Sequence, residues 1–215
     1  MIGATILDMD GTILAKRSID VFCETFGLTE ELKDIDKLSK SLPAYKITER
    51  IVELLKGKRR QEMIDIFNSI PLNPGVENFI DFLRKKDSMI AIATDSYQFL
   101  AEILAKKLGI ETVYGNIIEF KNDLITGKVL TKFHCLKISQ CKEYAVCKLW
   151  FLREIRSLTG GIIVCVGDGD SDYCAFTEAD IAIAYRPRSN RLKTISDTTV
   201  TDFDEALNYL KERIS

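Results

Sequence analysis

The chain has 215 residues, of which 46% are hydrophobic and 29% are charged, which is enough for one full core with a modest insertion. Its 30 basic and 32 acidic residues give a net charge of -2, and both signs are mixed along the chain, so nucleic acid is not an expected partner. The N-terminus shows no export signal, and no apolar run approaches the roughly 20 residues of a membrane span. We therefore expect a cytoplasmic protein with no membrane partner.

Short apolar runs alternate with longer stretches of helical periodicity, which is typical of parallel strands joined by crossover helices. The pattern predicts an α/β fold with a Rossmann-like parallel sheet. The clearest strands are expected at residues 4–7, 89–93, 162–166 and 181–184. Each is apolar on both faces, as buried parallel strands are. Polar residues follow three of them, at the edge where open sheets bind ligands.

The long segment between the first two predicted strands has the pattern of charged amphipathic helices. We expect residues 15–70 to form a small inserted helical cap, and residues 1–14 and 71–215 to form the core. Pro71, Pro74 and Gly75 mark the return of the chain to that core.

Three further elements are expected downstream. A helix should occupy residues 76–86. The Asn122-Asp123 pair between the alternating segments 117–120 and 124–130 predicts a β-hairpin. Asp202, with Glu205 three residues later, predicts the N-terminus of a final helix.

Two carboxylates, Asp8 and Asp10, directly follow the first predicted strand, and Gly11 comes next. Two-residue spacing at a strand end can aim both carboxylates at one site. One could attack a phosphorus atom while the other, kept protonated by its neighbour's charge, protonates the departing alkoxide. Gly11 would permit a tight turn that brings backbone amides near phosphate oxygens. The alternative is a polar turn without function.

A second acidic group, containing Asp168 and Asp172, follows another buried strand. Two acidic strand ends concentrate negative charge, so Mg²⁺ is the expected cofactor, with Asp168 the better-placed ligand. Thr94 ends a third strand and could donate to a phosphoryl oxygen, although a β-branched residue is also ordinary there. Lys148, at the start of an apolar-rich helix, could balance the charge of a transferring phosphoryl group.

These signatures, Asp-x-Asp, Thr, Lys and Gly-Asp-x-x-x-Asp in that order, resemble the haloacid dehalogenase superfamily, and the resemblance covers nearly the whole chain. Within it, the helical segment after the first motif and the Gly-Asp-Gly sequence are most similar to the phosphoserine phosphatase branch. The resemblance implies a magnesium-dependent phosphatase that acts on a small phosphorylated metabolite through an aspartyl-phosphate, as a monomer or homodimer.

The resemblance also implies a role for each motif residue. Asp8 would be the nucleophile, and Asp10 the general acid and then the general base. Thr94 and Lys148 would bind the phosphoryl group, and Asp172 would orient Lys148. The metal ligands would be Asp8, Asp168 and the backbone carbonyl of Asp10.

The chain departs from that branch at positions that bear on the substrate. Thr94 is followed by Asp95-Ser96 where the branch has two glycines, so Asp95 is expected to alter the phosphate-binding segment. Arg17 stands where the branch places a glutamate that holds the ammonium of serine, and Arg50 matches the arginine that holds its carboxylate. Two guanidinium groups facing the site would favour a second anionic group. The alternative is that Arg17 lies on a solvated surface.

Three other functions remain open at this point. The same residues would support a phosphotransferase that passes the phosphoryl group to an acceptor alcohol. A receiver-like signalling domain also places Asp, Thr and Lys at strand ends, but it has no long insertion after its first strand. A weakly active regulatory or binding member of the fold is the third alternative.

Six cysteines are spread along the chain, and free thiols are expected in a reducing compartment. His134, Cys135, Cys141 and Cys147 lie close together in sequence, which raises the question of a metal site. The two five-residue gaps between the cysteines do not match the short spacing of structural zinc knuckles. We therefore expect ordinary packing or an occasional disulfide there.

Overall fold

A computed structural model describes residues 1–131 and 135–214, so His134, whose role the sequence left open, lies outside the described residues. The core is a six-stranded parallel sheet with strand order β3-β2-β1-β6-β7-β8. Its strands are β1 (Ile2–Leu7), β2 (Met89–Tyr97), β3 (Thr112–Asn116), β6 (Ile162–Gly167), β7 (Ile181–Tyr185) and β8 (Thr198–Val200). This confirms the predicted α/β class and all four predicted strands.

Helices cover both faces of the sheet, which buries the strands on both sides. The helices are α1 (Ser18–Phe26), α2 (Thr29–Leu38), α3 (Ala44–Leu54), α4 (Arg60–Asn68), α5 (Val76–Lys85), α6 (Gln98–Leu108), α7 (Lys148–Leu158), α8 (Tyr173–Phe176), α9 (Asn190–Ile195) and α10 (Phe203–Ile214). Alternate residues of β1 enter different apolar clusters. Leu7 packs in the cluster that contains α5 and α10, and Ile6 packs in the one that contains α7, α8 and α9.

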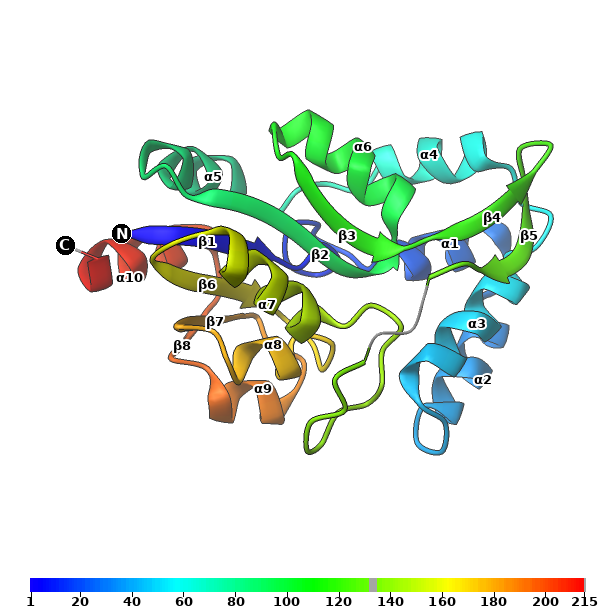
Figure 1. Cartoon of the computed structure of the whole chain (residues 1–215). Helices are drawn as coiled ribbons and strands as arrows, with labels where there is room; N and C mark the ends of the chain where they lie inside the picture. Colours follow the sequence, from blue (N-terminus) through cyan, green and yellow to red (C-terminus); the bar gives the residue numbers. More distant parts are fainter. Residues whose placement is uncertain (132–134, 215) are drawn as a thin grey trace.

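The four helices α1 to α4 occupy most of the predicted cap segment, and Figure 1 shows them gathered at one end of the sheet. The predicted hairpin forms from β4 (Ile118–Lys121) and β5 (Leu124–Val129), which pair in antiparallel register. Its turn residues Asn122 and Asp123 have φ of 51° and 65°, as a two-residue hairpin turn requires. The hairpin joins the helical segment through a hydrogen bond of 2.8 Å from the amide of Gly57 to the carbonyl of Ile125.

None of the helices in the described part of the chain is both long and apolar enough to cross a bilayer. The helix predicted at residues 76–86 is α5, and the final helix is α10. Asp202 caps that helix as expected, because its Oδ1 accepts a hydrogen bond of 2.8 Å from the amide of Glu205. The local sequence signal at Asp202 thus defines where α10 begins.

Candidate active site

Asp8 lies directly after β1, and its backbone amide still bonds to the carbonyl of Val166 in β6. Lys148, the first residue of α7, donates to Oδ1 of Asp8 at 2.5 Å and to Oδ1 of Asp172 at 2.6 Å. All three side chains are at most 4% exposed. One lysine therefore joins two buried carboxylates from different strand ends.

Two glycines allow the backbone to approach these carboxylates. Gly11 has φ of +79°, and a Cβ built on it would lie 2.3 Å from Oδ2 of Asp168. A Cβ on Gly167 would lie 2.2 Å from Cγ of Asp172. Any larger residue at either position would push a carboxylate out of place. Gly11 thus packs against Asp168, and this contact requires a glycine at position 11. The predicted approach of its backbone to a phosphate stays a prediction.

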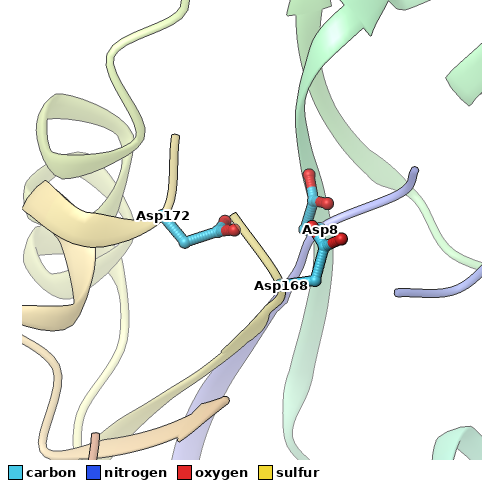
Figure 2. A group of neighbouring side chains, drawn as sticks. All are labelled: Asp8, Asp168 and Asp172. Carbon is cyan, nitrogen blue, oxygen red and sulfur yellow. The ribbon is translucent and has the colours of Figure 1, made fainter. Parts of the chain in front are cut away.

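The carboxylates of Asp8, Asp168 and Asp172 offer ligand atoms that all lie within 4.8 Å of one another (Figure 2). Burial raises the pKa of Asp8 well above its usual value, although Lys148 opposes this. Burial also raises the pKa of Asp168, against the effect of Arg188. Buried carboxylate oxygens suit a hard divalent cation such as Mg²⁺, which would favour their ionised form. The donor set therefore fits the predicted cofactor.

Asp10 is held by the first residue of α1. Its carboxylate accepts hydrogen bonds from the amide of Ser18 at 3.0 Å and from the hydroxyl of Ser18 at 2.8 Å. Burial raises the pKa of Asp10 to about 6, and the two bonds from Ser18 oppose that rise. A carboxyl group with such a pKa can both give and take a proton near neutral pH.

Lys148 keeps its proton despite its burial. Burial alone would lower its pKa, but Asp172 and Asp8 raise it above the usual value for lysine. The side chain is therefore a permanent cation at the floor of the site.

The carboxyl end of β2 differs in detail from the prediction, because the strand runs on to Tyr97 and does not end at Thr94. Thr94 is fully buried, and its hydroxyl accepts a hydrogen bond of 3.1 Å from the amide of Ser96. Asp95 and Ser96 are the residues of this segment that line the adjacent cavity. The hydroxyl of Ser96 is 3.0 Å from that of Ser18. A hydroxyl is therefore present on the cavity wall, but it belongs to Ser96, two residues beyond the predicted Thr94.

A cavity of about 610 Å³ opens above the site, and both Asp8 and Asp10 line it. One part of its wall comes from α1, α2 and α3 and from the loop between α2 and α3. The rest comes from the end of β2, from residues 141–144 and from the loops after β6 and β7. The enclosed volume is in the range of small-molecule sites. The site thus has a nucleophile, a proton-transfer group and room for a small ligand.

The two predicted cap arginines have different positions. Arg17 lines the cavity and also pairs with Asp20 at 3.1 Å. Arg50 is exposed and is not one of the residues that line the cavity. Helical periodicity explains this, because Ile47 and Ile51 occupy the cavity side of α3. The expectation that both guanidinium groups face the site is therefore not met at Arg50.

Sequence reasoning missed two residues that hold the predicted carboxylates. Ser18 bonds Asp10, and Arg188 bonds Asp168 at 2.6 and 3.1 Å. A signal for Arg188 was available, because it follows β7, whose carboxyl end lies at the same edge of the sheet as the acidic motifs. Ser18 had a weaker signal as a polar residue at the start of a helical segment.

Curated relatives match most of the chain. A phosphoserine phosphatase of Campylobacter jejuni subsp. doylei is 25% identical over 187 residues, covering 86% of this chain and 87% of the relative. That of Methanocaldococcus jannaschii is 25% identical over 210 residues, covering 96% of both. A phosphoserine phosphatase from Archaeoglobus fulgidus is longer and 23% identical, and the match covers 56% of its length.

Solved structures share the fold. A substrate-bound phosphoserine phosphatase complex superposes with a TM-score of 0.84 at 24% identity, covering 97% of this chain and 98% of the other. A phospho-aspartyl intermediate analogue of phosphoserine phosphatase gives a TM-score of 0.83, also at 24% identity and with the same coverage.

The fold and the relatives define the chain as an enzyme of the phosphatase type, as predicted. A family model described as haloacid dehalogenase-like hydrolase matches residues 5–177. The chain belongs to this family. The resemblance to the superfamily and to its phosphoserine phosphatases is thereby confirmed.

Proposed function

We propose that the protein hydrolyses a small phosphomonoester through an aspartyl-phosphate formed on Asp8. The observation that carries this proposal is the contact of Lys148 with both Asp8 and Asp172, since Asp8 lines a ligand-sized cavity. A carboxylate that faces a cavity beside a fixed cation is suited to attack phosphorus, because the cation offsets the charge that both reactants carry.

Two half-reactions follow from the arrangement. In the first, a carboxylate oxygen of Asp8 forms a bond to phosphorus, the ester bond breaks, and Asp10 gives its proton to the leaving oxygen. In the second, Asp10 takes a proton from water, the water oxygen bonds to phosphorus, and the bond to Asp8 breaks. Inorganic phosphate leaves, and both carboxyl groups return to their starting forms. Lys148 holds Asp8 in position throughout.

The predicted Mg²⁺ would be held by the carboxylates of Asp8 and Asp168 together with the backbone carbonyl of Asp10. When bound, it would supply positive charge that offsets repulsion between Asp8 and a phosphate dianion. Arg188 already pairs with Asp168 and lines the cavity. It would therefore keep one carboxylate oriented at the mouth of the metal site.

A screen of phosphorylated metabolites, read as phosphate release, tests this function. We expect turnover of at least one small phosphomonoester with Mg²⁺ and a loss of turnover in the presence of a chelator, which added Mg²⁺ restores. Product analysis with an added acceptor alcohol separates hydrolysis from transfer. Turnover that persists in excess chelator would contradict the proposed chemistry.

The substrate class is proposed from the wall of the cavity. Arg17 lines it, and the family resemblance implies a glutamate at this position in phosphoserine phosphatases, where it holds an ammonium group. We expect the preferred substrate to carry a second anionic group, since a charge-assisted hydrogen bond to a guanidinium is worth roughly 1.5–3 kcal/mol. On that scale the preference over phosphoserine should be about tenfold to a hundredfold in kcat/KM.

A matched pair of variants tests that preference. Arg17→Glu should raise kcat/KM for phosphoserine relative to phosphoglycolate and phosphoglycerate, because it reverses the charge beside the ligand. Arg50→Glu makes the same change on the exposed side of α3 and should leave the ranking unchanged. If the wild type prefers phosphoserine, or if both variants behave alike, Arg17 does not select the substrate.

Asp10 should titrate in the phosphorylation step. With a pKa of about 6, its carboxyl group is protonated below that pH and loses the proton above it. The rate of phosphorylation by an alkyl phosphate should therefore fall as the pH rises through about 6. Ser18→Ala removes a hydrogen bond that lowers this pKa, so the fall should move to higher pH. Single-turnover measurements across pH check both expectations.

Substrates with different leaving groups provide the control for the role of Asp10 as a proton donor. Asp10→Asn should slow alkyl phosphates by about a hundredfold to ten-thousandfold, the usual scale of proton donation. The slowing of phosphorylation by p-nitrophenyl phosphate should be much smaller, because its leaving group needs no proton. Equal slowing of both substrates would remove the acid role from Asp10.

A further inference from the structure

Four of the six cysteines gather beside the candidate active site, although they come from separate parts of the chain. The sulfurs of Cys135 and Cys141 lie 3.2 Å apart. Cys141 packs with Cys147 and Cys174 in one small apolar cluster, and the thiols of Cys141 and Cys174 are close enough to interact. Cys174 is the member that the sequence spacing could not reveal, because it lies in α8. All six cysteines are free thiols.

Backbone amides point at three of these sulfurs. The amide of Lys137 donates to Cys135 at 3.4 Å, and that of Glu143 donates to Cys141 at 3.3 Å. The amide of Trp150 donates to Cys147 at 3.4 Å. An N–H group directed at sulfur stabilises the thiolate more than the thiol, because the thiolate carries the charge. Such donors around sulfur are the outer contacts that orient and tune metal ligands.

The same turn occurs twice in this segment. Two residues after Cys135, Lys137 has φ of 46°, and two residues after Cys141, Glu143 has φ of 55°. Left-handed backbone is uncommon for residues with long side chains. Here it returns each amide to the preceding cysteine. Two turns of this kind, each with its amide directed at a sulfur, are more than ordinary packing of a thiol requires, and they are consistent with sulfurs arranged for a ligand.

The segment that carries three of these cysteines has no regular secondary structure. Residues 135–147 contain no helix or strand, yet they contact the rest of the molecule at defined points. The amides of Ala44 and Tyr45 bond to the carbonyls of Lys142 and Glu143 at 2.8 and 2.9 Å. A long irregular segment in a compact protein is usually either functional or a disordered linker, and the contacts of this one with α3 argue against a linker. A metal bound by thiolates would supply such bonds.

We propose that Cys135, Cys141, Cys147 and Cys174 bind one soft divalent cation of the zinc class in a closed, structural site. Four sulfur–metal bonds form, and the four thiol protons pass to solvent. With Zn–S bonds of about 2.3 Å, tetrahedral geometry places the sulfurs about 3.8 Å apart. Outside the aspartate triad, no three such ligands in the described residues lie within 4.8 Å of one another. Binding therefore requires side-chain rotation that draws the outer thiols inward.

The proposed metal site would be connected to the catalytic residues by very short stretches of backbone. Cys147 directly precedes Lys148, and Cys174 lies two residues after Asp172. A single ion would thus fix both ends of the Lys148–Asp172 ion pair. The same segment supplies Lys142 and Tyr144 to the cavity wall and bonds to the start of α3. The role is structural, because four protein thiolates leave no open coordination position.

Cobalt titration tests the proposal on the full chain, reduced and freed of metal by chelation. Mg²⁺ is kept in excess to fill the carboxylate site, and Co²⁺ is followed by its thiolate charge-transfer absorption, which reports sulfur ligands only. We expect about one Co²⁺ per chain, displaced by Zn²⁺. Bound metal should also protect four of the six thiols from alkylation.

Single variants complete the test. Cys135→Ser, in the irregular segment, and Cys174→Ser, in α8, should each weaken Co²⁺ binding by at least about tenfold and diminish the thiolate absorption. Cys23→Ala, in α1 and outside the cluster, should bind like the wild type. Absence of thiolate absorption in the reduced wild type overturns the proposal. Equal Co²⁺ binding by the wild type, Cys135→Ser and Cys174→Ser would also overturn it. A Cys135–Cys141 disulfide whose reduction restores no metal binding would have the same consequence.

Discussion

Asp8→Asn is expected to abolish turnover while leaving the protein folded. The amide has the shape of the carboxylate but cannot form a stable bond to phosphorus, so the covalent route is closed. Loss of a covalent nucleophile typically lowers kcat by about four to six orders of magnitude. Lys148 keeps its second partner, Asp172, at 2.6 Å, so the unfolding transition should move little.

Two measurements check this expectation. Steady-state phosphate release gives the loss of turnover, and mass spectrometry of acid-quenched enzyme gives the covalent state. Wild-type enzyme should gain the mass of one phosphoryl group during turnover, and Asp8→Asn should not. A phosphorylated species in the variant, or turnover above a trace, would assign the nucleophile elsewhere.

Lys148→Met is expected to have the largest effect on stability. It leaves Asp8 and Asp172 without their shared cation in a region where neither side chain is more than 4% exposed. Removing one partner of a buried ion pair typically costs about 3–5 kcal/mol, because the remaining charge is uncompensated. Urea unfolding at neutral pH should show a loss of that size, and turnover should be lost as well.

Lys142→Met is the matched control. Lys142 also pairs with an aspartate of the catalytic loop, Asp170, but its side chain is 47% exposed. Exposed ion pairs contribute about 1 kcal/mol or less. If the two variants lose similar stability, the Lys148 contacts do not compensate buried charge as proposed.

The central strands could be predicted from the sequence because their burial makes them apolar on both faces. β6 and β7 carry that signal without interruption, and in β1 only Thr5 is polar. β3 and β8 lie at the two edges of the sheet, where strands are short and contain polar residues. Edge strands of this kind lack the continuous apolar pattern, so their prediction needs the tertiary context.

The candidate site shows the same division. Asp8 and Asp168 could be placed together in advance, because motifs at the carboxyl ends of parallel strands meet at one edge of the sheet. Lys148 begins α7 and was placed with them by the family resemblance. Ser18 and Arg188 could not be placed in advance, because the course of a loop brings each of them to its carboxylate. Arg50 failed for a related reason, since family spacing does not fix which side of α3 a residue occupies.

The order of strands in the sheet also has a consequence for synthesis on the ribosome. β1 emerges early but lies between β2 and β6, and Asp8 meets Lys148 across 140 residues of chain. A nascent chain that has emerged only through α6 has one side of β1 unpaired, and it has no active site. Such non-local pairing slows folding and leaves a strand edge open to other chains. The enzyme should thus depend on chaperone protection until β6 has emerged and become its final partner.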